Sequence, residues 1–407
     1  VSGSVSWSFD DNLRMVREYV NNTSTDYLYD NDGLMVQAGE QALVRDPDNG
    51  FIESTTLGDI SSAYLYNVFG EVESHTATSA LSGQLYQRSD SYDRLGRVIA
   101  RTETVLGETH EYEYAYDERG RLYQVLRDDA LVESYTYDSN GNRIAATTEA
   151  AGTVTASHDA QDRLIGYGAI SYSHSSAGDI IRKQDGAELT DYYYDRLGNL
   201  RQVDLPDTTA IEYLIDARGR RVGKKVDGEL QQGFLYRDAL SPVAELGSNG
   251  STVVSRFVYA SRAHVPDYMV KEGVSYRFIT DPVGSVRLVV NTTDGSVAQR
   301  IDYDAFGNVL LDTNPGFQPF GFAGGLYDAD TGLVRFGARD YDPEIGRWTA
   351  RDPSLFADGP NLYAYARNRP SDRIDPSGLQ SAPMPSLTRP ARNTTVAEGH
   401  VCCDGNG

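Results

Sequence analysis

Cysteine is almost absent from this chain of 407 residues, which has only Cys402 and Cys403, side by side near its end. Neighbouring cysteines cannot link distant segments, so a disulfide framework is excluded and stability must come from burial. No run of 18 apolar residues occurs, which excludes a membrane-spanning helix. The six histidines lack the spacing of metal ligands and no phosphate-binding loop is present, so neither a metal nor a cofactor is expected.

Positive charge is also scarce. The chain has 37 Lys and Arg against 59 Asp and Glu, a formal net charge of −22. Phosphate groups are bound by clustered Lys and Arg, so this balance argues against nucleic acid and against an anionic membrane surface as partners. The Arg-rich stretch at residues 217–225 is interpreted as a turn whose cations balance nearby Asp. The acidity keeps a large surface soluble.

Helical periodicity is the third absence. No window keeps a 3.6-residue apolar period, and 39 glycines interrupt the candidates. The best exception, residues 360–370, has room for one or two turns. The chain is therefore not a helical protein.

Tyrosine, by contrast, is over-used, with 28 copies, and it recurs in one context, before Asp and a nearby Gly. The clearest copies begin at Tyr92, Tyr116, Tyr137 and Tyr194. From Tyr116 onward the pattern returns about every 21 residues, with one shorter step, and a fixed period of this length indicates a repeat array.

Each repeat reads as a β-hairpin. Residues 110–117, HEYEYAYD, alternate in the manner of a strand, and Asp-x-x-Gly favours a turn because Asp bonds nearby backbone N–H groups and Gly accepts positive φ. Residues 121–126 form the return strand. The predicted fold is all-β: tandem antiparallel hairpins in one curved sheet, too short to close a full shell.

From residue 276 the sequence changes character, although residues 276–310 still read as two hairpins. Residues 319–379, PFGFAGGLYDADTGLVRFGARDYDPEIGRWTARDPSLFADGPNLYAYARNRPSDRIDPSGL, resemble the Rhs-repeat-associated core of bacterial Rhs and wall-associated polymorphic toxins, insecticidal toxin-complex C proteins and teneurins. The resemblance covers the chain up to Leu379. It implies that residues 1–275 are the YD-repeat array of a spiral hollow shell and that residues 276–379 curl inward as a plug. Residues 380–407, rich in Pro, Ser and Thr, are expected to be a disordered variable tail.

The same resemblance implies self-cleavage by an aspartyl-type site after Leu379, with Leu379–Gln380 as the scissile bond. Asp352 and Asp375 are the predicted catalytic carboxylates, and Arg351 is the predicted neighbouring charge. Peptide hydrolysis needs a base to activate water and an acid to protonate the amine, and two close carboxylates share one proton.

Two alternatives to this site stay open. Asp before Pro is also a common turn residue, so Asp352 and Asp375 could have a purely structural role. Asp375 lies only four residues before the cut and could merely present Leu379. In that case Asp358 or Asp372 is the partner of Asp352.

The predicted function is that of the shell and plug of a polymorphic-toxin carrier that encapsulates a C-terminal effector. It includes at most one cut of the chain by itself and no external substrate. The expected partners are the N-terminal part of the same or a longer Rhs chain, and a C-terminal toxin with its immunity protein. The expected location is secreted or at the bacterial cell surface, through an export signal outside this chain. The alternative is a wall-associated adhesion or structural protein that binds glycan or protein without encapsulation.

Overall fold

The computed structural model describes residues 1–384, and its main element is one open sheet of 30 strands, each antiparallel to the next along the chain. This confirms the predicted all-β fold. The first strands are β1 (Val5–Phe9), β2 (Met15–Val20), β3 (Thr23–Tyr29), β4 (Met35–Ala38), β5 (Gln41–Arg45), β6 (Ile52–Leu57), β7 (Ile60–Tyr66), β8 (Val72–Ser79), β9 (Gly83–Tyr92), β10 (Val98–Val105), β11 (Glu108–Tyr116), β12 (Leu122–Arg127), β13 (Ala130–Tyr137), β14 (Arg143–Thr148) and β15 (Gly152–His158).

The second half of the sheet continues the same hairpins. Its strands are β16 (Leu164–Tyr167), β17 (Ile170–His174), β18 (Ile180–Asp185), β19 (Glu188–Tyr194), β20 (Leu200–Asp204), β21 (Ala210–Ile215), β22 (Arg221–Val226), β23 (Glu229–Tyr236), β24 (Pro242–Leu246), β25 (Val253–Val258), β26 (Tyr268–Lys271), β27 (Val274–Thr280), β28 (Val286–Asn291), β29 (Val297–Tyr303) and β30 (Val309–Asp312).

After β30 the regular structure is short. A four-stranded sheet contains β31 (Leu326–Tyr327), β32 (Val334–Phe336), β33 (Arg339–Asp342) and β34 (Arg347–Trp348). A two-stranded sheet pairs β35 (Arg373–Ile374) with β36 (Ala382–Pro383). In residues 1–384 the helical elements are three 3₁₀ turns, η1 (Phe322–Gly324), η2 (Leu355–Asp358) and η3 (Tyr365–Asn368).

The YD turn has the predicted construction. In the copy after β11, one Asp117 carboxylate oxygen accepts the N–H groups of Arg119 and Arg121, both at 2.9 Å. The other oxygen pairs with the Arg121 guanidinium at 2.7 Å. Gly120 has φ +81°, a value that glycine adopts without strain. The same Asp–Arg pair forms in residues 217–225, where Arg220 binds Asp216, so the predicted charge balance of that turn is confirmed there.

The tyrosine of most repeats links its hairpin to the preceding one, whereas the Tyr194 and Tyr303 hydroxyls form no hydrogen bond in the described residues. The Tyr137 hydroxyl donates to the carbonyl of Leu122 at 2.6 Å, and the Arg121 guanidinium lies over the Tyr137 ring, 4.6 Å from its centre. The ring packs across strands while its hydroxyl keeps a partner, which is the combination tyrosine offers. Hydroxyl bonds of the same kind are made by Tyr29, Tyr66, Tyr92, Tyr116, Tyr236 and Tyr259.

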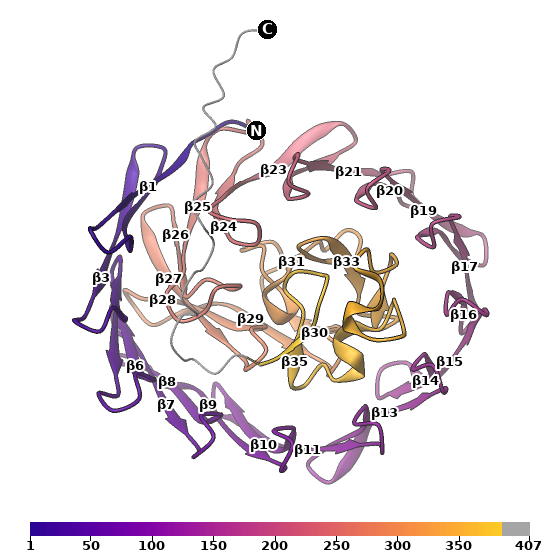
Figure 1. The fold of residues 1–407 in the computed structure, drawn as a ribbon, viewed down its shortest axis with the longest axis horizontal. Helices are drawn as coiled ribbons and strands as arrows, with labels where there is room; N and C mark the ends of the chain where they lie inside the picture. The colour runs from indigo at the N-terminus through magenta and orange to yellow at the C-terminus, as the bar shows by residue number, and fades with distance from the viewer. Residues whose placement is uncertain (385–407) are drawn as a thin grey trace, which may run out of the picture.

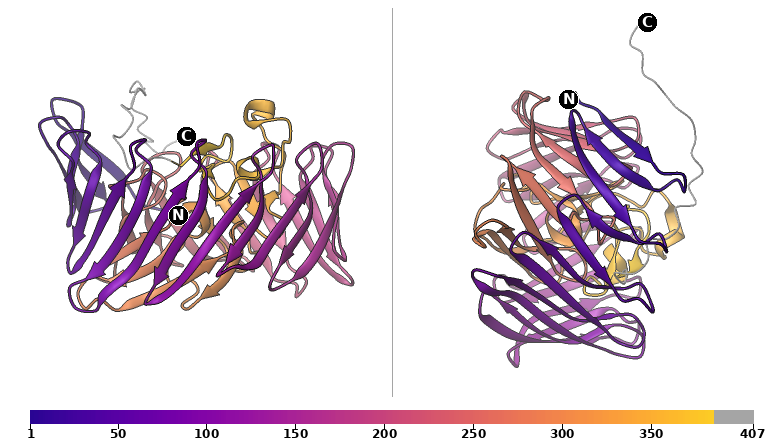
Figure 2. Two further views of the ribbon diagram at one scale, coloured as in Figure 1. Left: turned by 90° about the horizontal axis from the view of Figure 1, so that it is seen from below. Right: turned by 90° about the vertical axis from the view of Figure 1, so that its left-hand side faces the viewer.

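The sheet winds into a ring and then passes inside its own start (Figure 1). Strands β25–β28 lie on the inner side of β1–β8, where Arg277 bonds Thr55 at 2.9 Å and Gln41 bonds Asp267 at 3.1 Å. The views from the side agree with this spiral (Figure 2). Within the described residues β1 pairs only with β2, so packing, not a strand pair, closes the ring.

Residues 313–384 lie inside the ring (Figure 1). Their centre is an aromatic cluster of Phe322, Phe336, Tyr341, Trp348 and Tyr365. The predicted division at residue 276 lies inside β27, and in the fold the change of character comes after Asp312. The predicted disordered tail begins at residue 380, but residues 380–384 are described and include β36, so the prediction is wrong for its first residues. The rest of the tail, residues 385–407 with both cysteines, lies outside the described part. Across residues 1–384 the structure contains no helix with the length and apolar character needed to cross a membrane.

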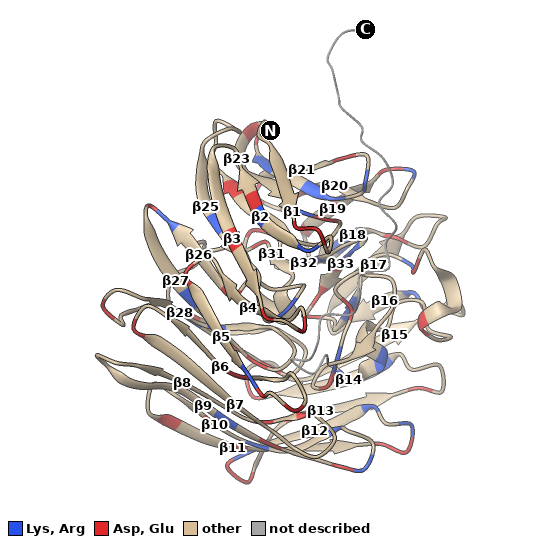
Figure 3. Ribbon diagram, turned by 60° about the vertical axis from the view of Figure 1, so that its left-hand side comes forward, with Lys and Arg blue, Asp and Glu red and all other residues tan. Residues whose placement is uncertain are grey.

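Buried charges join this inner segment to the ring wall. Arg221 of the wall donates to Asp340 at 2.7 Å, and Arg335 of the inner segment binds the other oxygen of Asp340 at 2.8 Å. Lys224 of the wall binds Asp328 at 2.5 Å. Charges of both signs also run along the outer strands and turns (Figure 3). The inner segment is therefore fixed to the wall by directional contacts as well as by apolar packing.

Stability is expected to fall as pH rises from 5 to 8, because of one buried carboxyl of the wall. Glu133 is 8% exposed, accepts the N–H of Ala305, and lies near Asp304. Burial raises its pKa to about 8 from an ordinary 4.5. Between these values the unfolded chain ionises first, so stability is lost as pH rises, by about 3 kcal/mol. Melting temperatures measured across this range check it.

Glu133→Gln is the control for this effect. Gln keeps the size and the acceptor but does not ionise, so the variant is expected to show a flatter pH dependence and a higher melting temperature at pH 8. Glu113→Gln, in an exposed strand position, is the comparison. A wild-type slope unchanged by Glu133→Gln would assign the pH dependence to other groups.

Candidate functional site

Two of the predicted carboxylates lie against one buried arginine. The Arg339 Nη2 atom is 2.8 Å from Asp352 Oδ2 and 3.5 Å from Asp375 Oδ2. All three side chains are buried. Since both oxygens contact one nitrogen, the carboxylates are neighbours, well inside the roughly 10 Å at which a shared water could still link them. Their catalytic role stays a prediction.

The Leu379–Gln380 peptide is held on both sides of the bond. Asp375 Oδ1 accepts the Leu379 and Gln380 N–H groups, each at 3.1 Å. The Ser354 hydroxyl lies 3.1 Å from the Leu379 carbonyl oxygen and 2.5 Å from Asp352 Oδ1. The predicted scissile bond is thus in contact with Asp375 directly and with Asp352 through Ser354.

The other predicted residues are placed differently. Arg351 is exposed, and the ion pairs to Asp352 and Asp375 come from Arg339, so the neighbouring cation is Arg339 rather than Arg351. Asp358 accepts the Ser381 hydroxyl at 2.9 Å and pairs with Arg367.

The second alternative partner, Asp372, pairs with Arg369. Its backbone carbonyl accepts the Met384 N–H at 3.0 Å. Asp358 and Asp372 therefore fix the chain after the bond, whereas Asp352 and Asp375 border the bond itself.

The local chain explains how these groups meet. Arg339 starts β33, and its Nε donates to the Gly378 carbonyl at 2.5 Å. Gly378 has φ +66°, and a Cβ there would clash with the Phe336 carbonyl, so only glycine fits. Asp375 follows β35 directly. Residues 375–379 are thereby hydrogen-bonded to the start of β33.

The surroundings of Asp375 shift its pKa. Burial raises the pKa of Asp375, although Arg339, the Ser377 hydroxyl and the two amide donors oppose the shift. A carboxyl with a raised pKa holds its proton to higher pH and suits the role of an acid beside a leaving amine. Burial lowers the pKa of Arg339, although the charges of Asp352 and Asp375 oppose the shift.

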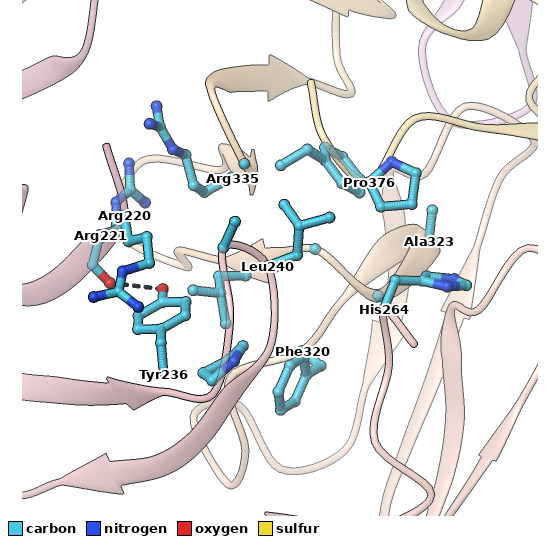
Figure 4. A pocket seen from close by; sticks show the side chains of 16 residues that line it. Arg220, Arg221, Tyr236, Leu240, His264, Phe320, Ala323, Arg335 and Pro376 are labelled. Carbon is cyan, nitrogen blue, oxygen red and sulfur yellow. Dashed lines mark hydrogen bonds between the residues drawn. The ribbon is translucent and has the colours of Figure 1, made fainter. Parts of the chain in front are cut away.

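Two cavities lie beside the site, on either side of Leu240. One, of about 310 Å³, is bordered by Leu197, Leu240, Arg351 and Leu379. The other, of about 30 Å³, lies between the wall and the inner segment and is shown in Figure 4, where Leu240 and Pro376 border it. There the Tyr236 hydroxyl donates to the Arg221 carbonyl at 2.7 Å. In residues 1–384 no three His, Cys, Asp or Glu residues are grouped to hold a metal.

Sequence reasoning missed Arg339 and Ser354. Ser354 carried a signal, because a hydroxyl two residues after Asp commonly bonds that carboxylate in a turn. Its N–H and hydroxyl both contact Asp352 Oδ1. Arg339 carried none, because it is far along the chain from both acids.

Comparisons with known proteins agree with this fold. The Teneurin YD-shell family matches residues 1–370. Teneurin-4 of Homo sapiens is 28% identical over 390 residues, covering 91% of this chain and 14% of the relative. The tRNA3(Ser)-specific nuclease WapA of Bacillus spizizenii is 30% identical over 278 residues, covering 65% of this chain and 12% of the relative.

A solved structure of the Photorhabdus luminescens Tc holotoxin pore is similar in fold. Its TM-score is 0.75 at 19% identity, and the match covers 95% of this chain and 21% of that one. The chain thus spans only a small part of the length of the proteins it resembles.

Proposed function

The chain belongs to the Teneurin YD-shell family, and on that basis we propose that it is the plugged section of a YD shell that encloses an effector and cuts itself after Leu379. The observation that carries the cleavage is the pair of acids at one peptide bond: Asp375 contacts the Gln380 N–H at 3.1 Å, and Ser354 links Asp352 to the Leu379 carbonyl.

The proposed reaction consumes one water. Asp352 takes a proton from the water as its oxygen adds to the Leu379 carbonyl carbon. The carbon–nitrogen bond then breaks, and Asp375 gives a proton to the Gln380 nitrogen. Arg339, in contact with both acids, would hold the negative charge as it passes from one to the other.

The proposed enclosure must extend beyond this ring, because its interior is already filled. Because residues 313–384 occupy the ring, an effector would lie in a space completed by other strands, contributed by a longer chain or a partner. Strand β1 pairs on one side only, so its free edge could accept such a strand. The shell would act outside the cell or at its surface.

The first experiment is the mass of the purified wild-type chain over several days. We expect conversion to a fragment that ends at Leu379, with no added protease or metal, at a rate independent of protein concentration because the bond is tethered to its catalyst. A chain that keeps its full mass, or a rate that rises with concentration, would count against self-cleavage in cis.

A further inference from the structure

Leu379 lies at an open apolar pocket that the inner segment shares with the wall. The pocket has a volume of about 310 Å³. Its apolar lining includes Leu197 and Leu240, from two YD turns of the wall, and Ala338, Ala350 and Pro353 from the inner segment. Leu379 borders the same space and is 36% exposed. The residue that immediately precedes the proposed cut is therefore part of the wall of this pocket.

The backbone around Leu379 leaves that side chain little other freedom. The Ser377 carbonyl accepts the Ala338 N–H at 2.8 Å, and the Gly378 carbonyl accepts Arg339 Nε at 2.5 Å. The Leu379 N–H is bonded to Asp375 at 3.1 Å. These three bonds hold the backbone of residues 377–379 in place and keep Leu379 at the border of the pocket.

We propose that Leu197 and Leu240 determine the specificity of self-cleavage by seating the Leu379 side chain, an inference that rests on the proposed function. Both are positioning residues, because they line the pocket that Leu379 borders and are not among the groups bonded to the scissile peptide. The pocket exists only where these turns meet the inner segment. Cleavage would then occur only in a chain whose wall has closed around its plug.

Exposure alone does not single out these leucines. Leu197 is 84% exposed in the turn Asp195-Arg196-Leu197-Gly198, and Leu95 is 74% exposed in the identical turn Asp-Arg-Leu-Gly at residues 93–96. Only Leu197 of the two lines the pocket. Leu95 is therefore a matched control, with the same turn and the same side chain but no contact with the site.

The experiment compares cleavage rates of the Leu197→Ala/Leu240→Ala double variant, the Leu95→Ala variant and the wild type by mass. We expect the double variant to be about tenfold slower, the usual effect of losing apolar contacts in a specificity pocket. Leu95→Ala should match the wild type. Adding Leu379→Phe to the double variant should recover part of the rate, because a larger side chain reaches the widened walls. A purely structural role would give no such rescue.

Equal rates in the double variant and the wild type would overturn the inference and leave self-cleavage standing. An uncut wild type would overturn self-cleavage. The role of Leu197 and Leu240 in seating Leu379 is then tested by measuring amide hydrogen exchange in the Asp352→Asn chain. There the Gln380 amide should exchange about tenfold faster once Leu197 and Leu240 are shortened, if their contacts contribute as above. Unchanged exchange would overturn the inference independently of any cleavage.

Discussion

Replacing Asp352 with Asn is expected to leave the Leu379–Gln380 bond intact. Asn keeps the shape of Asp and can still accept the Ser354 N–H, which lies 2.7 Å from Asp352 Oδ1, but it cannot take a proton from water. Loss of a general base typically slows a reaction 10²–10⁴-fold, so about 10³-fold is expected here. The mass of the variant, followed beside the wild type, measures the effect.

Asp375→Asn should have an effect of similar size for the opposite reason, since its amide cannot protonate the Gln380 nitrogen. The controls are Asp358→Asn and Asp372→Asn, which alter the acids that fix the chain after the bond and should cleave at close to the wild-type rate. If Asp358→Asn abolished cleavage while Asp375→Asn cleaved normally, the acid would be Asp358 and the assignment of Asp375 would fall. A single cooperative melting transition for each variant would show that it is folded.

The hairpins could be predicted because every contact that defines them is local. The turn after β11 is made by Asp117, Gly120 and Arg121, all within five residues, and its strands are next to each other in the chain. The spiral could not be predicted in this way. It depends on pairs such as Arg277 with Thr55, more than 200 residues apart, for which no short motif exists.

The site divides in the same way. Asp352, Asp375 and Leu379 were identified through a family resemblance, and the structure brings them together. Arg351 was chosen because it precedes Asp352, yet Asp352 is buried and Arg351 is exposed. Arg339 reaches both acids from β33, and only the folded chain reveals that contact.

Arg339 is expected to contribute more to the free energy of unfolding than any exposed cation of this chain. It is 3% exposed and contacts Asp352 and Asp375, and its guanidinium lies 4.1 Å from the centre of the Trp348 ring. Removing one partner of a buried ion pair leaves uncompensated charge and typically costs about 3–5 kcal/mol. Here two carboxylates would be left.

The Arg339→Met variant should therefore melt several degrees below the wild type at pH 7.5, and the difference should shrink in acid. Without the cation, burial raises the folded-state pKa of Asp375 further above the unfolded value. The unfolded chain then ionises first as pH rises, so stability is lost between the unfolded and the folded pKa and is regained below the unfolded pKa. Thermal melting at pH 4.5 and 7.5 gives the comparison.

Two further variants separate charge from packing at this position. Arg339→Lys keeps the cation but loses the planar fork, so it should melt between the wild type and Arg339→Met at pH 7.5. Arg351→Met removes an exposed arginine beside the same acids along the chain and should melt like the wild type at both pH values. If Arg339→Met lowered the melting temperature equally at both pH values, the loss would come from its packing on Trp348. Burial of the two acids without a cation would then cost no stability, and this result would contradict the ion-pair argument.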